Sequence, residues 1–203
     1  MATSAHDWIW DGGRPCLDLV NTLRDRWNEP RELLVTPADL AEWAERSGLA
    51  AAAGERVPEP EPALLEEARG LREAVDRLLI VAREGTSPEA ADIATVNRWA
   101  VRAHEARPLL KDDGGVLRSA DPAPGVERAL AGAAADTIAL VAAGETGAVR
   151  VCSHERCGLR FHDRSPGRNR RWCSMTRCGN RAKAARHYGG TRRSGAKGGE
   201  RPS

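Results

Sequence analysis

Apolar residues recur every three or four positions along most of the first 150 residues, which is the spacing of one face of a helix. The clearest case is the segment TPADLAEWAERSG (36–48), in which Leu40 and Trp43 lie on one apolar stripe. Thr36 is a favoured residue at a helix N-cap, and Gly48 is favoured just past a helix end. This segment is therefore predicted to be an amphipathic helix with both ends defined.

The same period predicts four more helices, separated by residues that break helices. The first, in GGRPCLDLVNTL, places Leu17, Val20 and Leu23 on one face. The proline-rich stretch 51–62 is expected to be a connector. The other helices are expected over 63–84, which Gly85 ends, from Ser87 and Pro88 to about Pro108, and over 126–143. Between the last two, PLLKDDGGVLRSA (108–120) has an Asp-Gly-Gly turn between two apolar runs and predicts a short β-hairpin.

Three polar residues of this helical region lie close to apolar faces, namely Asn21, Arg72 and Asn97. Buried polar groups are usually hydrogen-bonded within the protein, so a structural role is the first interpretation. The alternative is a pocket between helices in which these three residues bind a small molecule. A fifth cysteine, Cys16, lies beside an apolar face and is expected to be a small buried hydrophobe.

Four cysteines near the C-terminus, Cys152, Cys157, Cys173 and Cys178, are spaced C-x4-C-x15-C-x4-C. Two close pairs separated by a loop can supply the tetrahedral thiolate shell that Zn²⁺ prefers, and four thiolates leave no position for water. We therefore expect one structural Zn²⁺ per chain and no catalytic metal. Disulfides, unrelated thiols or an iron–sulfur cluster are the alternatives, as is replacement of one cysteine by His154 or His162.

The segments around these cysteines predict a small fold built on the metal. AVRVCS and GLRFHD read as two short strands that flank the first pair, and a helix is expected from Cys178 onward. A knuckle on a hairpin followed by ligands at a helix start is a treble-clef-like arrangement. The predicted fold class is mainly α: a helical domain (1–147) with a short β-hairpin, then a zinc-binding domain (148–190) and a disordered basic tail (191–203).

Charge is distributed unevenly between these regions. Residues 151–203 hold 14 Lys and Arg against three acids, a formal +11, whereas residues 1–150 carry a formal −9. A strongly basic end suggests an anionic partner, and arginine forks bond phosphate or guanine bidentately. Docking on the acidic region or on another protein is the alternative, with RNA or a membrane surface after it. The candidate nucleic-acid-binding residues are Arg168, Arg170, Arg171, Arg177, Arg181, Lys183 and Arg186.

The words RRWCSM and RCGNR resemble the CGNR zinc finger, whose name matches the residues from Cys178 to Arg181. Upstream, GGRPCLDLVNTL and LREA resemble the ABATE domain that accompanies this finger, in a family described as stress-induced transcription regulators. The resemblance extends to about Tyr188. It implies that Cys152, Cys157, Cys173 and Cys178 are the metal ligands and that the finger binds DNA.

These observations favour a bacterial-type transcription regulator in which the finger binds DNA and the helical domain senses a small-molecule effector or forms a homodimer. The alternative is a zinc-stapled module that binds a protein or RNA without sequence-specific DNA binding. An enzyme is not expected, because no nucleophile with a paired base, phosphate loop or open metal site is visible. No apolar run spans a bilayer and no signal peptide is visible, so we expect a cytoplasmic protein without membrane contact.

Overall fold

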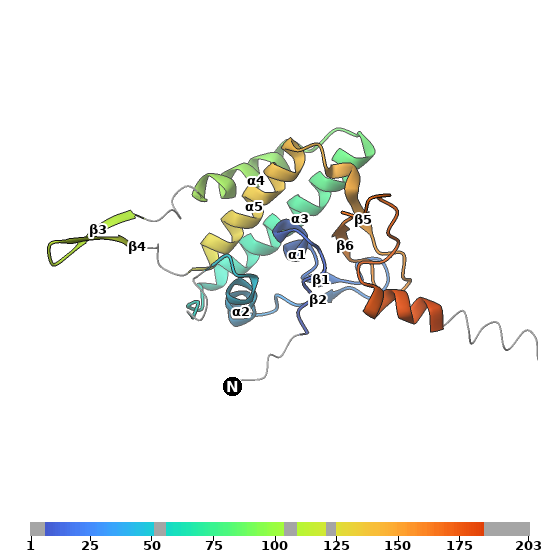
Figure 1. The fold of residues 1–203 in the computed structure, drawn as a ribbon, viewed down its shortest axis with the longest axis horizontal. Coiled ribbons are helices and arrows are strands. Elements are labelled where there is room, and N and C mark those ends of the chain that lie inside the picture. The colour runs from blue at the N-terminus through green and yellow to red at the C-terminus, as the bar shows by residue number, and fades with distance from the viewer. Residues whose placement is uncertain (1–6, 51–55, 104–108, 121–124, 185–203) are drawn as a thin grey trace, which may run out of the picture.

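Five α-helices build the N-terminal part of the chain in the residues that the computed structural model describes, which are 7–50, 56–103, 109–120 and 125–184 (Figure 1). The helices α3, α4 and α5 lie side by side, and α1 and α2 pack against α3 and α5. Trp43 and Trp99 are fully buried in the shared core. The helix bounds are α1 (Pro15–Val20), α2 (Pro37–Ser47), α3 (Pro62–Glu84), α4 (Ala90–Arg102) and α5 (Val126–Ala142).

The ends of α2 and α3 follow from local sequence, as predicted. Thr36 is the N-cap of α2: its hydroxyl accepts from the Asp39 N–H (3.2 Å) and the Asp39 carboxylate accepts from the Thr36 N–H (2.7 Å). This reciprocal pair is a capping box. Gly48 and Gly85 end α2 and α3 in the left-handed conformation, which costs glycine little.

The bounds of α1 and α4 differ from the sequence prediction, and α4 ends at Arg102 rather than near Pro108. The first helix stops at Val20, and Leu23 instead lies in the strand β1 (Leu23–Arg24), which pairs antiparallel with β2 (Arg31–Glu32). The helix α4 begins at Ala90 rather than at Ser87 and Pro88. A contact with a residue outside the helix lies at each boundary: Asn21 after α1 bonds to the C-terminal part, and Asp92 in the first turn of α4 pairs with Arg77.

The predicted hairpin between α4 and α5 is confirmed as β3 (Leu109–Asp113) and β4 (Val116–Ala120). Gly114 and Gly115 both have positive φ at the turn, and the Asp112 carboxylate accepts from the Gly115 N–H. The hairpin stands away from the helices and exposes Leu110 and Leu117 (Figure 1).

The C-terminal part is a small unit packed on the helices. A short turn η1 (Thr146–Ala148) leads into β5 (Val149–Val151), which pairs antiparallel with β6 (Arg160–His162). A π-type turn, η2 (Met175–Gly179), opens a helix that continues over 180–184. The helix therefore begins at Met175, three residues earlier than the start that the sequence predicts at Cys178. The mainly α class with small hairpins and a C-terminal zinc-binding domain is confirmed. In the described part of the chain, no helix is both long and apolar enough to cross a membrane.

Candidate metal centre and basic surface

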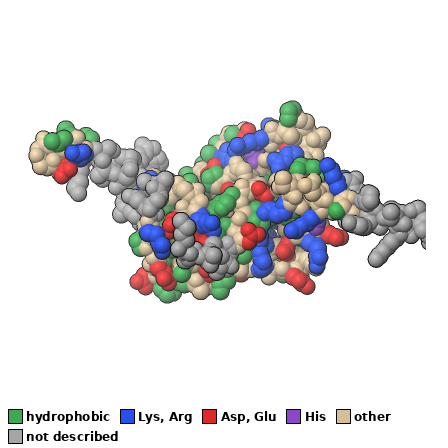
Figure 2. Space-filling view, turned by 60° about the horizontal axis from the view of Figure 1, so that its bottom comes forward, with side chains coloured by type: hydrophobic (Ala, Val, Ile, Leu, Met, Phe, Trp, Pro, Cys, Tyr) green, Lys and Arg blue, Asp and Glu red, His purple; other side chains and the backbone are tan. Residues whose placement is uncertain are grey.

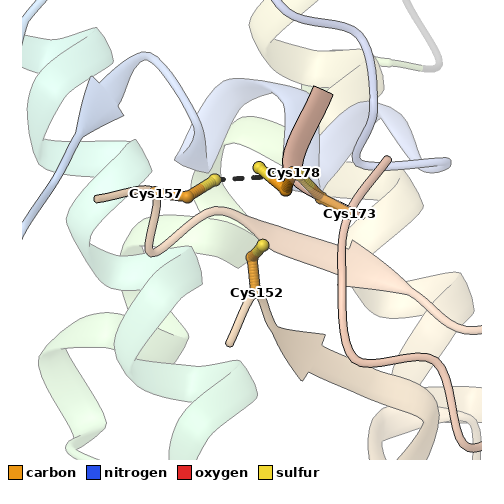
Figure 3. A group of neighbouring side chains, drawn as sticks. All are labelled: Cys152, Cys157, Cys173 and Cys178. Carbon is orange, nitrogen blue, oxygen red and sulfur yellow. Dashed lines mark hydrogen bonds between the residues drawn. The ribbon is translucent and has the colours of Figure 1, made fainter. Parts of the chain in front are cut away.

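The four cysteines come from two turns that fold toward each other (Figure 3). Cys152 follows β5 directly and Cys157 precedes β6, so the first pair sits on the knuckle of the β5–β6 hairpin. Cys173 ends the loop after β6, and Cys178 lies in the turn η2. This arrangement fits the predicted treble-clef-like domain.

The sulfur atoms have the spacing of a zinc site. All four lie within 4.8 Å of one another, with Cys157 and Cys173 at 3.7 Å and Cys173 and Cys178 at 3.8 Å. Four sulfurs about 2.3 Å from one Zn²⁺ at tetrahedral corners lie about 3.8 Å apart. A disulfide needs about 2.0 Å, and the four are free thiols. The residues therefore fit one structural zinc ion, as predicted.

Crowding of the four sulfurs has an electrostatic consequence. The thiols of Cys157 and Cys173 donate to Cys152 and lower its pKa to about 2. The interaction with Cys152 raises the pKa of Cys157 to about 12, and burial raises that of Cys178 to about 12. Four thiolates together would repel strongly, so a cation at their centre is required for all four to ionise.

Groups around the sulfurs hold them in place. Arg177 donates to the Cys173 sulfur (3.8 Å), and the same guanidinium is ion-paired with Asp11 from the segment before α1. Backbone N–H groups of His154 and Cys173 bond to the Cys152 sulfur. Such outer contacts orient metal ligands. Arg177, predicted to contact nucleic acid, is thus partly committed to the metal centre.

Neither histidine near the cysteines belongs to the group of ligand atoms in the described residues. His162 lies buried in β6, where its Nε2 is 3.3 Å from Glu145 and its Nδ1 accepts from Arg164. Burial lowers the pKa of His162, which keeps it neutral. The His154 Nδ1 accepts from the Arg156 N–H within its own turn. A four-cysteine shell therefore describes the site better than one with a histidine.

The loop between the two cysteine pairs is organised by Asp163, which is 1% exposed. Its carboxylate accepts from the N–H and hydroxyl of Ser165 and from the Arg170 N–H, at 2.7–3.0 Å. Burial opposes ionisation, but these bonds outweigh it and hold the pKa of Asp163 below its usual value. The Arg170 guanidinium bonds the Cys173 carbonyl and stacks on Phe161. These hydrogen bonds and the stacking contact hold the conformation of the loop between the two cysteine pairs.

The finger is joined to the helical domain by a buried ion pair. Arg160 of β6 donates to both carboxylate oxygens of Asp76 in α3, at 2.9 and 3.1 Å. Trp27 stacks on the same guanidinium, 4.4 Å from the ring centre. The Asn21 side chain bonds both the N–H and the carbonyl of Arg160 at 2.8 Å, as a neighbouring strand would. Sequence reasoning missed this junction; its one signal was a charged residue, Asp76, on the apolar face of α3.

The three candidate small-molecule residues are not brought together. Asn21 is buried and occupied by Arg160, and Arg72 is buried with bidentate bonds to Glu32 at 2.6 and 2.7 Å. Asn97 is exposed on α4. The polar atoms of Asn21 and Arg72 thus serve packing between α1, β2, α3 and β6. A pocket that uses them remains a prediction.

The candidate nucleic-acid residues are mostly at the surface. Arg168, Arg170, Arg171, Arg181 and Lys183 are exposed, while Arg186 lies outside the described residues, as does the tail 191–203. Figure 2 shows Lys and Arg side chains gathered on the half of the molecule that carries the finger. Arg168 adopts a positive φ of 43° in the loop, and its carbonyl accepts from Arg150. The finger therefore presents a broad basic face.

A helical domain tied to a four-cysteine zinc finger is the class of protein that this fold and site define. Residues 13–144 match the ABATE family model, described as "Putative stress-induced transcription regulator". Residues 148–190 match the CGNR zinc finger. The chain therefore belongs to the ABATE family and carries a CGNR zinc finger, as the resemblance implied. Among curated proteins, no sequence matches this chain.

Proposed function

We propose that this chain is a transcription regulator whose zinc finger binds DNA through its exposed arginines. The observation that carries the proposal is that these exposed basic side chains have no carboxylate partner among the described residues. In the part of the chain that the structure describes, no carboxylate pairs with Arg168, Arg171, Arg181 or Lys183. Unpaired guanidinium groups on a rigid loop and a helix start are the groups that bond phosphates and guanine edges.

The competing interpretation is that the basic end docks on the acidic helical domain. Among the described residues, two arginines of the finger form ion pairs with that domain, Arg160 with Asp76 and Arg177 with Asp11. Both ion pairs lie where the finger meets the helical domain. The exposed arginines lie outside this junction, so intramolecular docking accounts for Arg160 and Arg177 and leaves the surface charge free for an external polyanion.

A salt titration tests the proposal. Zinc-loaded protein is titrated onto a labelled duplex of random sequence, and affinity is measured by fluorescence anisotropy over a range of salt concentrations. About six phosphate contacts give a slope of log K against log salt near −5, at roughly 0.9 per phosphate. The variants Arg171→Gln and Arg181→Gln should each reduce the slope by about 0.9 if that side chain contacts phosphate. Arg98→Gln, exposed on α4, is the matched control and should change nothing.

The result that rejects the DNA proposal is binding that is absent or insensitive to salt. An RNA duplex and single strands of the same length serve as competitors; stronger binding to them favours the alternative of an RNA-interaction module. Selection of duplexes from a random pool by the zinc-loaded protein then separates sequence-specific from general binding. A role of the helical domain in sensing an effector or in forming a homodimer, and a location in the cytoplasm, are parts of the same proposal.

A further inference from the structure

A cleft separates the β1–β2 hairpin of the helical domain from the zinc finger. Its walls come from the segment before α1, from the hairpin and from both cysteine pairs of the finger, so neither domain forms it alone. Guanidinium groups dominate the lining. The charged residues that line it are Arg24, Arg31, Arg156, Arg177 and Arg181, together with Asp7 and Asp25.

The hairpin contributes two arginines that oppose each other. Arg24 and Arg31 are direct partners in the β1–β2 register. Like charges directly opposite on neighbouring strands destabilise a sheet, and this sheet has only two residues per strand. The local arrangement thus works against folding, and violations of this kind are expected where a site serves binding.

Burial of Arg24 adds to the free-energy cost of placing it opposite Arg31. The side chain lines the cleft while the residue is only 8% exposed, and in the described ranges no carboxylate lies within ion-pair distance of it. Burial and the charge of Arg31 lower its pKa from the ordinary arginine value, and Arg177 acts in the same direction. An anion that enters the cleft would therefore meet a guanidinium that no carboxylate of the described residues neutralises.

The finger side of the cleft has the same character. Arg156 and Arg181 are exposed and lack an acidic partner among the described residues. Arg177 is paired with Asp11 through one terminal nitrogen, while its Nε is buried without a hydrogen-bond partner. Asp7 and Asp25 raise the pKa of Arg24 but do not pair with it, and five arginines line the cleft beside these two carboxylates.

We propose that this cleft binds a phosphate group, held between the hairpin arginines Arg24 and Arg31 and the finger arginines Arg156 and Arg181. Guanidinium forks recognise phosphate oxygens bidentately, and such charge-assisted bonds are the strong ones. Where the phosphate belongs to DNA, the inference rests on the proposed function and extends it. The β1–β2 hairpin of the helical domain then forms part of the nucleic-acid interface. A free phosphorylated molecule offers the same chemistry and would make the cleft an effector site.

The test uses Arg31→Gln and Arg24→Gln in the zinc-loaded full chain, with Arg98→Gln as control. Two probes are titrated separately: pyrophosphate, followed by calorimetry, and a duplex DNA of random sequence, followed by anisotropy. Loss of one charged contact should weaken binding of the relevant probe roughly tenfold. Thermal melting is measured in parallel. Arg31→Gln should melt at or above the wild-type temperature, because it removes a like-charged pair at an exposed position. Arg31 is exposed, so Arg31→Gln tests the cleft even if Arg24→Gln disturbs packing.

The outcomes distinguish a phosphate of the DNA backbone from that of a small phosphorylated molecule. They also distinguish failure of the DNA-binding proposal from failure of the cleft proposal. Weaker DNA binding with a slope reduced by about 0.9 per variant assigns the phosphate to the DNA backbone. Weaker pyrophosphate binding with unchanged DNA binding assigns it to a small phosphorylated ligand. If the wild-type protein binds no duplex, the proposed function fails while the pyrophosphate titration still decides the cleft. Wild-type-like binding of both probes by both variants, or no binding of either probe by the wild type, overturns the inference.

Discussion

The buried ion pair between Arg160 and Asp76 allows the sharpest prediction about stability. Its side chains are 3% and 10% exposed, and both guanidinium–carboxylate bonds are near ideal length. Asp76→Asn removes the charge and keeps the shape, which leaves a buried guanidinium without its counter-ion. Breaking one side of a buried pair costs about 3–5 kcal/mol. Arg26, which also lies 3.6 Å from Asp76, loses an attraction as well.

The effect is measured by urea and thermal unfolding of the zinc-loaded protein. For a chain of this size, about 3 kcal/mol corresponds to a fall in melting temperature of roughly 6–12 °C. The control is Glu42→Gln, which breaks an exposed pair with Arg46 on α2. That variant should cost less than about 0.5 kcal/mol. An equal loss of unfolding free energy in Asp76→Asn and Glu42→Gln would show that the buried pair contributes no more to stability than an exposed one.

A double-mutant cycle isolates the pair from other losses. Arg160→Met removes the charge and keeps much of the packing against Trp27. The double variant Asp76→Asn/Arg160→Met should be less destabilised than the sum of the two single variants, because no unpaired charge remains. A coupling energy below about 0.5 kcal/mol, the level at which independent sites add, would show that the two side chains do not act together.

Three further predictions concern the metal, a carboxylate and a helix cap. Metal analysis should find one zinc per wild-type chain and none in Cys178→Ser, and a folded wild-type protein without metal would contradict the assignment. Burial raises the pKa of Asp18 to about 7, so its protonated form stabilises the fold at low pH and this stability is lost as pH rises through 7. Asp18→Asn should therefore melt above wild type at pH 8, with a difference that shrinks toward pH 4; a difference independent of pH would exclude this cause. Thr36→Ala should cost about 1 kcal/mol of unfolding free energy in urea, and no loss would mean that the capping box with Asp39 contributes nothing.

Features that depend on neighbours in the sequence could be predicted, and features that depend on distant partners could not. The helix α2 and the four-cysteine site follow from spacing over a few residues, and both are confirmed. Strands β1 and β2 are two residues long and carry no periodicity to detect. Arg160 and Asp76 are 84 positions apart, so no local pattern pairs them.

The place of Asn21 shows the same limit. Its position near an apolar face correctly suggested a buried polar group, but its partner is the backbone of β6, 139 positions away. The short helix α1 ends where this bond forms, so an error of three residues at the helix end has the same origin as the missed junction. Arg72 behaves likewise, since its partner Glu32 belongs to a strand that the pattern does not reveal.

The segment before α1 couples the metal to the helical domain, and this leads to a last prediction. Ile9 packs against the finger's cysteine cluster, Asp11 pairs with Arg177, and the Gly12 carbonyl accepts from the His162 N–H (2.8 Å). The same segment continues into α1, whose Cys16 and Leu17 are fully buried in the helical core.

Removing zinc should therefore destabilise more than the finger. Structural zinc supplies about 10–16 kcal/mol of folding energy in small fingers, and without it the contacts to Ile9, Asp11 and Gly12 have no fixed partner. Amide hydrogen exchange on protein stripped by a chelator should show faster exchange in the finger and also in α1, while α4, which packs on α3 and α5, serves as the internal reference. Unchanged protection of α1 after zinc removal would show that the two domains fold independently, and that the junction through Arg160 and Asn21 adds contact without coupling.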